Sequence, residues 1–154
     1  MEPTTVDMNQ ALIRLSEKDS ARFWKEDFAS LSAPERVFRV VWELESQVNN
    51  GGFDQFFYNS AGDVVANAAG FLEEIGAAQM ARIVRSAASV FGPGGPALDR
   101  EQRRVQLDDL DDDQEDTLES LDAEFYGYPE NLTELLYRFV QKHRAQIRGA
   151  GDVL

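Results

Sequence analysis

The sequence contains no cysteine and a single histidine, His143. The lack of cysteine excludes disulfide bonds and thiolate metal sites, and it is typical of proteins in a reducing cytoplasm. No apolar run approaches the ~18 residues that crossing a membrane requires. The first ten residues are acidic and polar, unlike a secretory signal. We therefore expect a cytoplasmic protein that is not integral to a membrane.

Residues suited to catalysis are also scarce. Without cysteine, a second histidine or a serine in a nucleophile motif, the sequence offers no acyl-transfer triad. His143 falls on the apolar side of a predicted helix and near its end, which favours a packing role. The glycine-rich stretches at 49–52 and 92–95 lack the preceding strand and the following Lys-Ser/Thr of a phosphate loop. We expect neither enzymatic activity nor a cofactor.

Positive charge is missing from one long segment. Of the 28 acidic residues, twelve lie between Asp108 and Glu134, where there is no lysine or arginine. The remaining 16 acids nearly balance the 15 basic residues, so this segment accounts for almost all of the net charge of −13. Such a charge repels nucleic acids and membrane surfaces and attracts basic proteins. We expect no direct binding to nucleic acids or membranes.

The acidic segment does not fit a calcium-binding loop. Counted from Asp109, acids stand at positions 1, 3 and 5 of an EF-hand. Position 6 is Gln114, where the loop needs glycine, and position 12 is Ser120, where it needs a bidentate glutamate. The sequence therefore predicts no metal site.

The same segment predicts helices with one packed and one charged side. On the charged side the carboxylates stand three or four residues apart, or about 5–6 Å, which weakens a helix by about 0.2–0.5 kcal/mol for each pair. Either this face only keeps the protein soluble, or it imitates a nucleic-acid backbone. One helix can imitate only a single strand, so mimicry needs acids from neighbouring helices or from a second subunit. The candidate partner-binding residues are Asp108, Asp109, Asp111, Asp112, Asp113, Glu115, Asp116, Glu119 and Asp122.

Apolar residues recur at helical spacing along the chain, and no segment alternates like a strand. The pattern predicts an all-α protein, a single globular domain of about eight helices. We expect residues 1–29 to form an N-terminal helical extension packed on a domain of residues 30–148. The predicted helices are 5–18, 21–28, 33–48, 53–58, 64–75, 77–91, 99–110, 112–125 and 130–148.

The stretch from Asn49 to Asp63 has the most distinctive composition of the chain. We expect its two adjacent glycines to turn the chain sharply, its phenylalanines to anchor the return, and its amides to satisfy backbone groups at helix ends. Asp63 is expected to cap the following helix. A small-ligand site at this turn is the alternative. The residues of this structural motif are Asn49, Asn50, Gly51, Gly52, Phe53, Gln55, Phe56, Asn59, Gly62 and Asp63.

The stretch Trp42 to Asp63, WELESQVNNGGFDQFFYNSAGD, resembles the signature of a bacterial family long catalogued as a domain of unknown function. Its characterised branch is the acidic DNA-mimic proteins. A second match, LDAEFY, runs from Leu121 to Tyr126. The resemblance implies an all-helical, often dimeric protein without known enzymatic activity.

The resemblance also implies a function. In the DNA-mimic branch an acidic surface occupies the DNA-binding face of a transcriptional regulator. We therefore expect this chain to bind a basic DNA-binding protein in competition with DNA, and to form a homodimer. The signature is mostly uncharged, so it assigns no acid to the binding surface. The alternative is an immunity or antitoxin-like inhibitor of a basic nuclease toxin, for which the same charge would serve.

Overall fold

The computed structural model describes residues 1–17 and 26–154. These residues form seven α-helices and four 3-10 helices and no strand, which confirms the predicted all-α class. Most of the predicted helix 21–28 lies outside the described residues. The chain divides into two compact units, Val40–Glu130 and the remainder. The domain boundary expected after residue 29 stays a prediction. None of the described helices combines the length and the apolar character that crossing a bilayer requires.

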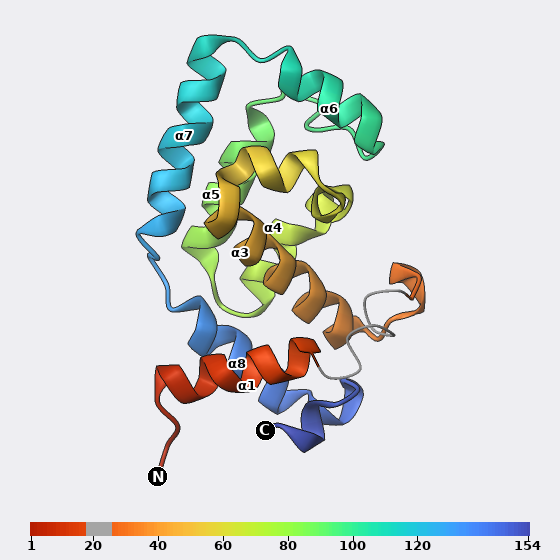
Figure 1. The fold of residues 1–154 in the computed structure, drawn as a ribbon, viewed down its shortest axis with the longest axis vertical. Helices are drawn as coiled ribbons and strands as arrows, with labels where there is room; N and C mark the ends of the chain where they lie inside the picture. The colour runs from red at the N-terminus through yellow and green to blue at the C-terminus, as the bar shows by residue number, and fades with distance from the viewer. Residues whose placement is uncertain (18–25) are drawn as a thin grey trace. The chain divides into compact units, whose positions relative to one another are not determined.

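The first unit joins the two ends of the chain, Met1–Arg39 and Asn131–Leu154. It contains α1 (Thr5–Glu17), η1 (Phe28–Ser30), the start of α3 (Ala33–Tyr58), α8 (Leu132–Lys142), η3 (Arg144–Gln146) and η4 (Ala150–Asp152). In Figure 1, α1 crosses α8. Leucines spaced three or four residues apart, such as Leu12 and Leu15 on α1 and Leu132 and Leu136 on α8, give each helix a buried side.

The sequence Ser32-Ala-Pro-Glu35 has the pattern of a capping box, and such a box starts α3 at the predicted residue. The backbone N–H of Glu35 donates to Oγ of Ser32 over 3.2 Å, and the N–H of Ser32 donates to Oε1 of Glu35 over 3.0 Å. Arg148 donates to Glu35 (2.8 Å) and to Glu26 (2.6 Å). The prediction of a helix as far as residue 148 was wrong: α8 ends at Lys142, and two 3-10 helices follow. The chain leaves the helix because Arg148 turns back to these two carboxylates.

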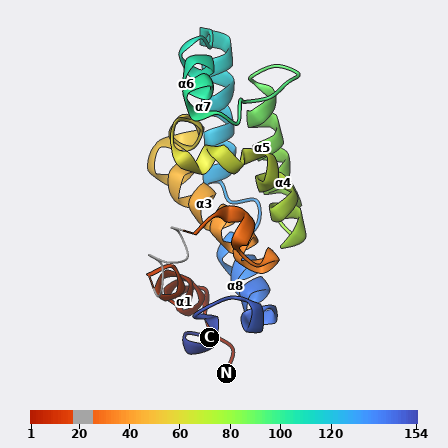
Figure 2. The ribbon, with the colours of Figure 1, turned by 90° about the vertical axis from the view of Figure 1, so that its right-hand side faces the viewer.

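The second unit consists of the helices that carry the distinctive sequence features. It contains the remainder of α3, η2 (Ser60–Val64), α4 (Val65–Glu74), α5 (Ala78–Ser89), α6 (Arg100–Asp108) and α7 (Asp112–Tyr126). In Figure 2, α4 and α5 lie side by side as a hairpin, and α5 also contacts α7. Gly76, with φ 96°, adopts the left-handed conformation at the turn of this hairpin.

The predicted turn at Gly51 and Gly52 divides α3 into two segments. Gly51 has φ −155°, whereas Gly52 has φ 73° and ψ −173°, a conformation that favours glycine. The chain changes direction here, as Figure 1 shows in the change from orange to yellow. After the turn, the buried ring of Phe53 lies 6.0 Å from that of Phe57 and 6.0 Å from that of Phe125 on α7. The predicted aromatic anchor is therefore confirmed.

Candidate functional site

Eight acidic residues between Asp108 and Glu119, at the end of α6 and along α7, lie on an exposed face. Asp111 caps α7 in a second capping box: the backbone N–H of Gln114 donates to its Oδ1 over 2.8 Å, and its own N–H donates to Oε1 of Gln114 over 2.9 Å. Leu118, Leu121 and Phe125 are buried, so the carboxylates point to solvent. Glu101 of α6 pairs with Arg104 and Glu124 of α7 pairs with Arg82, but within the described part of the chain no lysine or arginine pairs with any of the exposed acids from Asp108 to Glu119. This acidic surface consists of Asp108, Asp109, Asp111, Asp112, Asp113, Glu115, Asp116 and Glu119, all of them exposed.

Carboxylates from three helices meet at one edge of this surface. An open hollow of about 330 Å³ is lined by Asp54, Gln55 and Tyr58 from α3, Leu107 and Asp108 from α6, and Glu115 from α7. A larger hollow of about 440 Å³ lies between α5 and α7, with Asp111 and Asp113 in its lining. The negative charge is thus not confined to one helix. The sequence alone did not show whether acids of neighbouring helices lie together.

Asp122 differs from the other candidate acids. It is half-buried, and its Oδ1 accepts a hydrogen bond from the backbone N–H of Phe53 over 2.8 Å. Burial raises the pKa of Asp122; the Phe53 N–H opposes this, and the charges of Asp54 and Glu119 add to it. Asp122 therefore caps the segment of α3 that begins at Phe53. This contact gives Asp122 a structural role, and it is not part of the acidic surface.

The prediction that the amides of the motif satisfy backbone groups was wrong. The side chains of Gln55 and Asn59 both donate to Oε1 of Gln47 over 2.9 Å, and Asn50 donates to Oε1 of Gln55 over 3.0 Å. Asn49 donates to the hydroxyl of Tyr128 over 2.6 Å. The turn brings the end of the first segment of α3 next to the start of the second, so the amides bond to one another across it. Asp122 supplies the cap in their place.

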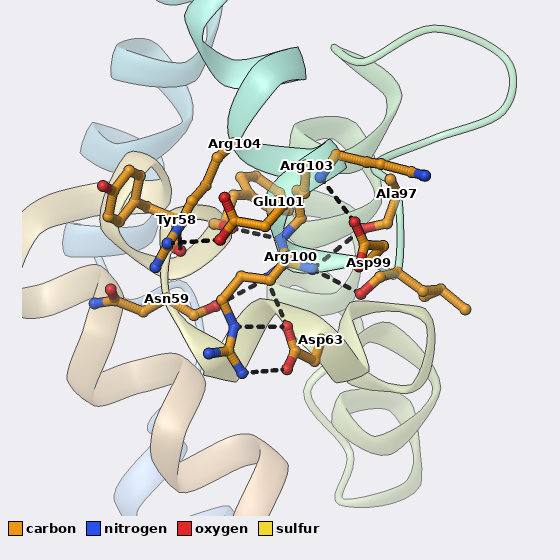
Figure 3. Close-up of polar contacts among 12 residues, drawn as sticks. Tyr58, Asn59, Asp63, Ala97, Asp99, Arg100, Glu101, Arg103 and Arg104 are labelled. Carbon is orange, nitrogen blue, oxygen red and sulfur yellow. Dashed lines mark hydrogen bonds and ion pairs between the residues drawn. The ribbon is translucent and has the colours of Figure 1, made fainter.

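The second half of the motif, from Phe56 to Asp63, packs around the side chain of Arg103 on α6. Arg103 was not among the candidate residues predicted from the sequence. Its side chain is fully buried. Nη2 donates to the carbonyl of Asn59 (2.9 Å) and to Oδ1 of Asp63 (2.8 Å), Nη1 donates to the carbonyls of Ala97 (3.1 Å) and Leu98 (3.2 Å), and Nε donates to that of Phe57. Figure 3 shows Arg103 with three of these partners, Asn59, Asp63 and Ala97. Five donors thus meet five acceptors, as a buried charge requires.

The position of Arg103 explains why glycine occupies position 62 and aspartate occupies position 63. A Cβ on Gly62 would lie 2.8 Å from the carbonyl oxygen of Phe56 and 2.9 Å from Nε of Arg103, so only glycine fits. The prediction that Asp63 caps the next helix was wrong, because α4 begins without a side-chain cap. Asp63 instead accepts from Arg100 (2.7 Å) and Arg103 (2.8 Å). Although burial opposes it, these bonds hold the pKa of Asp63 below its ordinary value. The sequence did contain a signal for the burial of Arg103: it stands four residues before Leu107, and this spacing places both residues on the same side of a helix.

The described residues give no support to metal chemistry. Residues 112–120 are helical, whereas an EF-hand would hold them in a loop. No three His, Asp or Glu side chains of the described part are grouped to hold a metal ion. His143 packs as predicted, with its ring 4.5 Å from that of Phe139.

The fold and the site define an acidic all-α protein with a structural signature and a separate, exposed row of carboxylates. The family model for the DMP19-like protein matches residues 29–143. The chain therefore belongs to the DMP19-like family, which is the family of DNA mimics, and the resemblance found in the sequence is confirmed. Neither the comparison with curated proteins nor that with solved structures gave a match.

Proposed function

We propose that this protein binds a basic DNA-binding protein, a transcriptional regulator, through the acidic surface and in competition with DNA. The observation that carries the proposal is a row of exposed carboxylates that are unpaired within the described part of the chain. The lysines and arginines with which such a partner binds phosphates can bind carboxylates in the same way. A second copy of the chain, which the family resemblance implies, would add a second row.

Several of these acids stand at positions where they do not stabilise their helix, which favours partner binding as the explanation for their presence. Asp112, Asp113 and Glu115 lie in the first turn of α7, where the helix dipole favours negative charge. Asp108 and Asp109, however, lie at the end of α6, where the dipole disfavours it. The last acids of the row, Asp116 and Glu119, lie beyond the first turn of α7 and stand close to acids of the same sign. All four positions are unfavourable for helix stability, and only Asp108 has a basic residue, Arg104, four residues away on its helix.

The test neutralises acidic residues that make no ion pair within the described part of the chain. The variant carries Asp109→Asn, Asp116→Asn and Glu119→Gln, all exposed and outside the 330 Å³ hollow. The matched control carries Glu2→Gln, Asp27→Asn and Glu74→Gln, which are also exposed and lie outside the acidic surface. The partner is first captured from native cell lysate at low salt and then purified. Displacement of labelled DNA from it is followed by fluorescence anisotropy.

We expect the variant to compete with DNA about tenfold less well than the parent protein, since three exposed charges contribute about 0.5 kcal/mol each. Its binding should also depend less steeply on salt, because exposed charges are screened within about 8–10 Å. The control should compete like the parent. If the variant matches the parent in affinity and salt dependence, the acidic surface only keeps the protein soluble. If the captured partner is a nuclease toxin, the immunity-like alternative holds instead.

A further inference from the structure

We infer that the 330 Å³ hollow receives an arginine side chain of the protein partner. The inference rests on the proposed function and adds two residues to the binding surface, Asp54 and Tyr58, which lie outside the acidic segment. The lining comes from three helices and consists of Asp54, Gln55, Tyr58, Leu107, Asp108 and Glu115. Its volume is at the small end of the ~300–1,000 Å³ typical of ligand sites, which suits one side chain rather than a chain segment.

The charge of the lining selects a cation. Asp54, Asp108 and Glu115 are exposed, and none of them is paired with a base within the described part of the chain. No lysine, arginine or histidine contributes to the lining. The half-buried side chain of Leu107 and the ring of Tyr58 add apolar surface beside the carboxylates. A long basic side chain matches this arrangement, because its methylene stem is apolar and its head is charged.

The exposed aromatic ring favours arginine over lysine. Tyr58 already carries one guanidinium: Cζ of Arg104 lies 4.1 Å from the ring centroid, and Nε of Arg104 donates to the carbonyl of Tyr58 over 2.9 Å. Figure 3 shows this pair near the buried Arg103. Even so, Tyr58 remains 50% exposed. A planar guanidinium can stack on the free part of the ring and donate to two carboxylates at once, which an ammonium cannot do.

The turn at Gly52 places these residues. After the turn, Phe53, Phe56 and Phe57 are buried, which leaves Asp54 and Tyr58, four residues apart, on the exposed side of the same segment. The family signature thus does more than pack the core. It presents one carboxylate and one aromatic ring next to the acids of α6 and α7.

The test uses a blocked peptide of alternating glycine and arginine, with the same peptide in lysine as its counterpart. Each is titrated into the ¹⁵N-labelled full chain, and backbone amide shifts are followed by NMR. We expect the arginine peptide to shift the amides of residues 54–58 and 107–108 most, and to bind more tightly than the lysine peptide. The variant Asp54→Asn, which leaves the Tyr58–Arg104 contact in place, should weaken binding about threefold. Adding Tyr58→Ala should bring the loss to about tenfold.

Glu74→Gln is the matched control, since it removes one exposed acid outside the hollow and should change little. Equal binding of the two peptides, shifts that leave residues 54–58 and 107–108 unaffected, or wild-type affinity of Asp54→Asn with its fold intact would each overturn the inference. The two proposals fail separately. If the Asp109, Asp116 and Glu119 variant loses the native partner while the Asp54 and Tyr58 variant keeps it, the proposed function stands and the hollow has no part in it.

Discussion

Replacing Gly52 by alanine tests why the family signature contains two adjacent glycines. Gly52 combines φ 73° with ψ −173°, a region that is almost reserved for glycine. A Cβ there would lie 2.4 Å from Oδ2 of Asp122. Since Oδ1 of the same carboxylate accepts the N–H of Phe53 over 2.8 Å, moving Asp122 aside also weakens the cap of the second segment of α3. The substitution therefore adds backbone strain and removes a cap together.

The magnitude follows from these two effects. Backbone strain of this kind costs about 1–3 kcal/mol, and the loss of a helix cap costs about 0.5–2 kcal/mol. We therefore expect Gly52→Ala to lower the free energy of unfolding by about 1.5–5 kcal/mol. At about 2–4 °C for each kcal/mol, the melting temperature should fall by about 3–20 °C. Gly70→Ala is the control: Gly70 lies on α4 with open space around it, and alanine there should stabilise by about 0.5–1 kcal/mol.

The assay is thermal and urea unfolding followed by circular dichroism, with Asp122→Ala and the double variant completing a cycle. In the Asp122→Ala background the new methyl group no longer meets a carboxylate. Gly52→Ala should then cost less than it does in the parent, with only the backbone strain left. Additive effects would show that the contact with Asp122 is irrelevant. A Gly52→Ala protein that melts with the parent would refute the account of the turn altogether.

Three further predictions concern the rest of the site. Arg103→Met should destabilise by about 3–5 kcal/mol, because four carbonyls lose their donor and Asp63 loses one of its two. Arg100 is exposed, so Arg100→Gln should cost at most about 1 kcal/mol, and urea unfolding of both variants measures the difference. Burial raises the pKa of Glu45, and the hydrogen bond from Tyr128 only partly opposes this. The charged form of Glu45 therefore disfavours folding once the pH rises above its pKa in the unfolded chain, about 4.3. Glu45→Gln should therefore stabilise near pH 7 and lose this advantage near pH 3.5, as measured by urea unfolding at both. Calorimetric titration with calcium should find no sub-micromolar site; one would contradict the helical assignment of residues 112–120.

Local sequence signals predicted most of the helices and their starts. The capping box at Ser32–Glu35 joins residues three apart, as does the one at Asp111–Gln114 that was not predicted, and the buried faces follow from apolar residues three or four apart. The acidic segment, too, is a property of neighbouring residues. Such features can be predicted because helix geometry fixes which near neighbours meet. Where a distant contact intervened, as Arg148 does with Glu35, the predicted end of the helix was wrong.

The roles of single polar residues depended on contacts between distant parts of the chain. Asp63 and Arg103 are 40 residues apart, and Phe53 and Asp122 are 69 apart. In the sequence Asp63 has the pattern of a cap, whereas Asp122 is one more acid in a charged row and also lies within the second family match, where a structural cap or pair was the alternative. The sequence by itself determined most of the helices, the concentration of charge and the family. Only the tertiary structure decided which charges are buried and bound and which are free for a partner, because a charge is paired or solvated according to what the fold brings beside it.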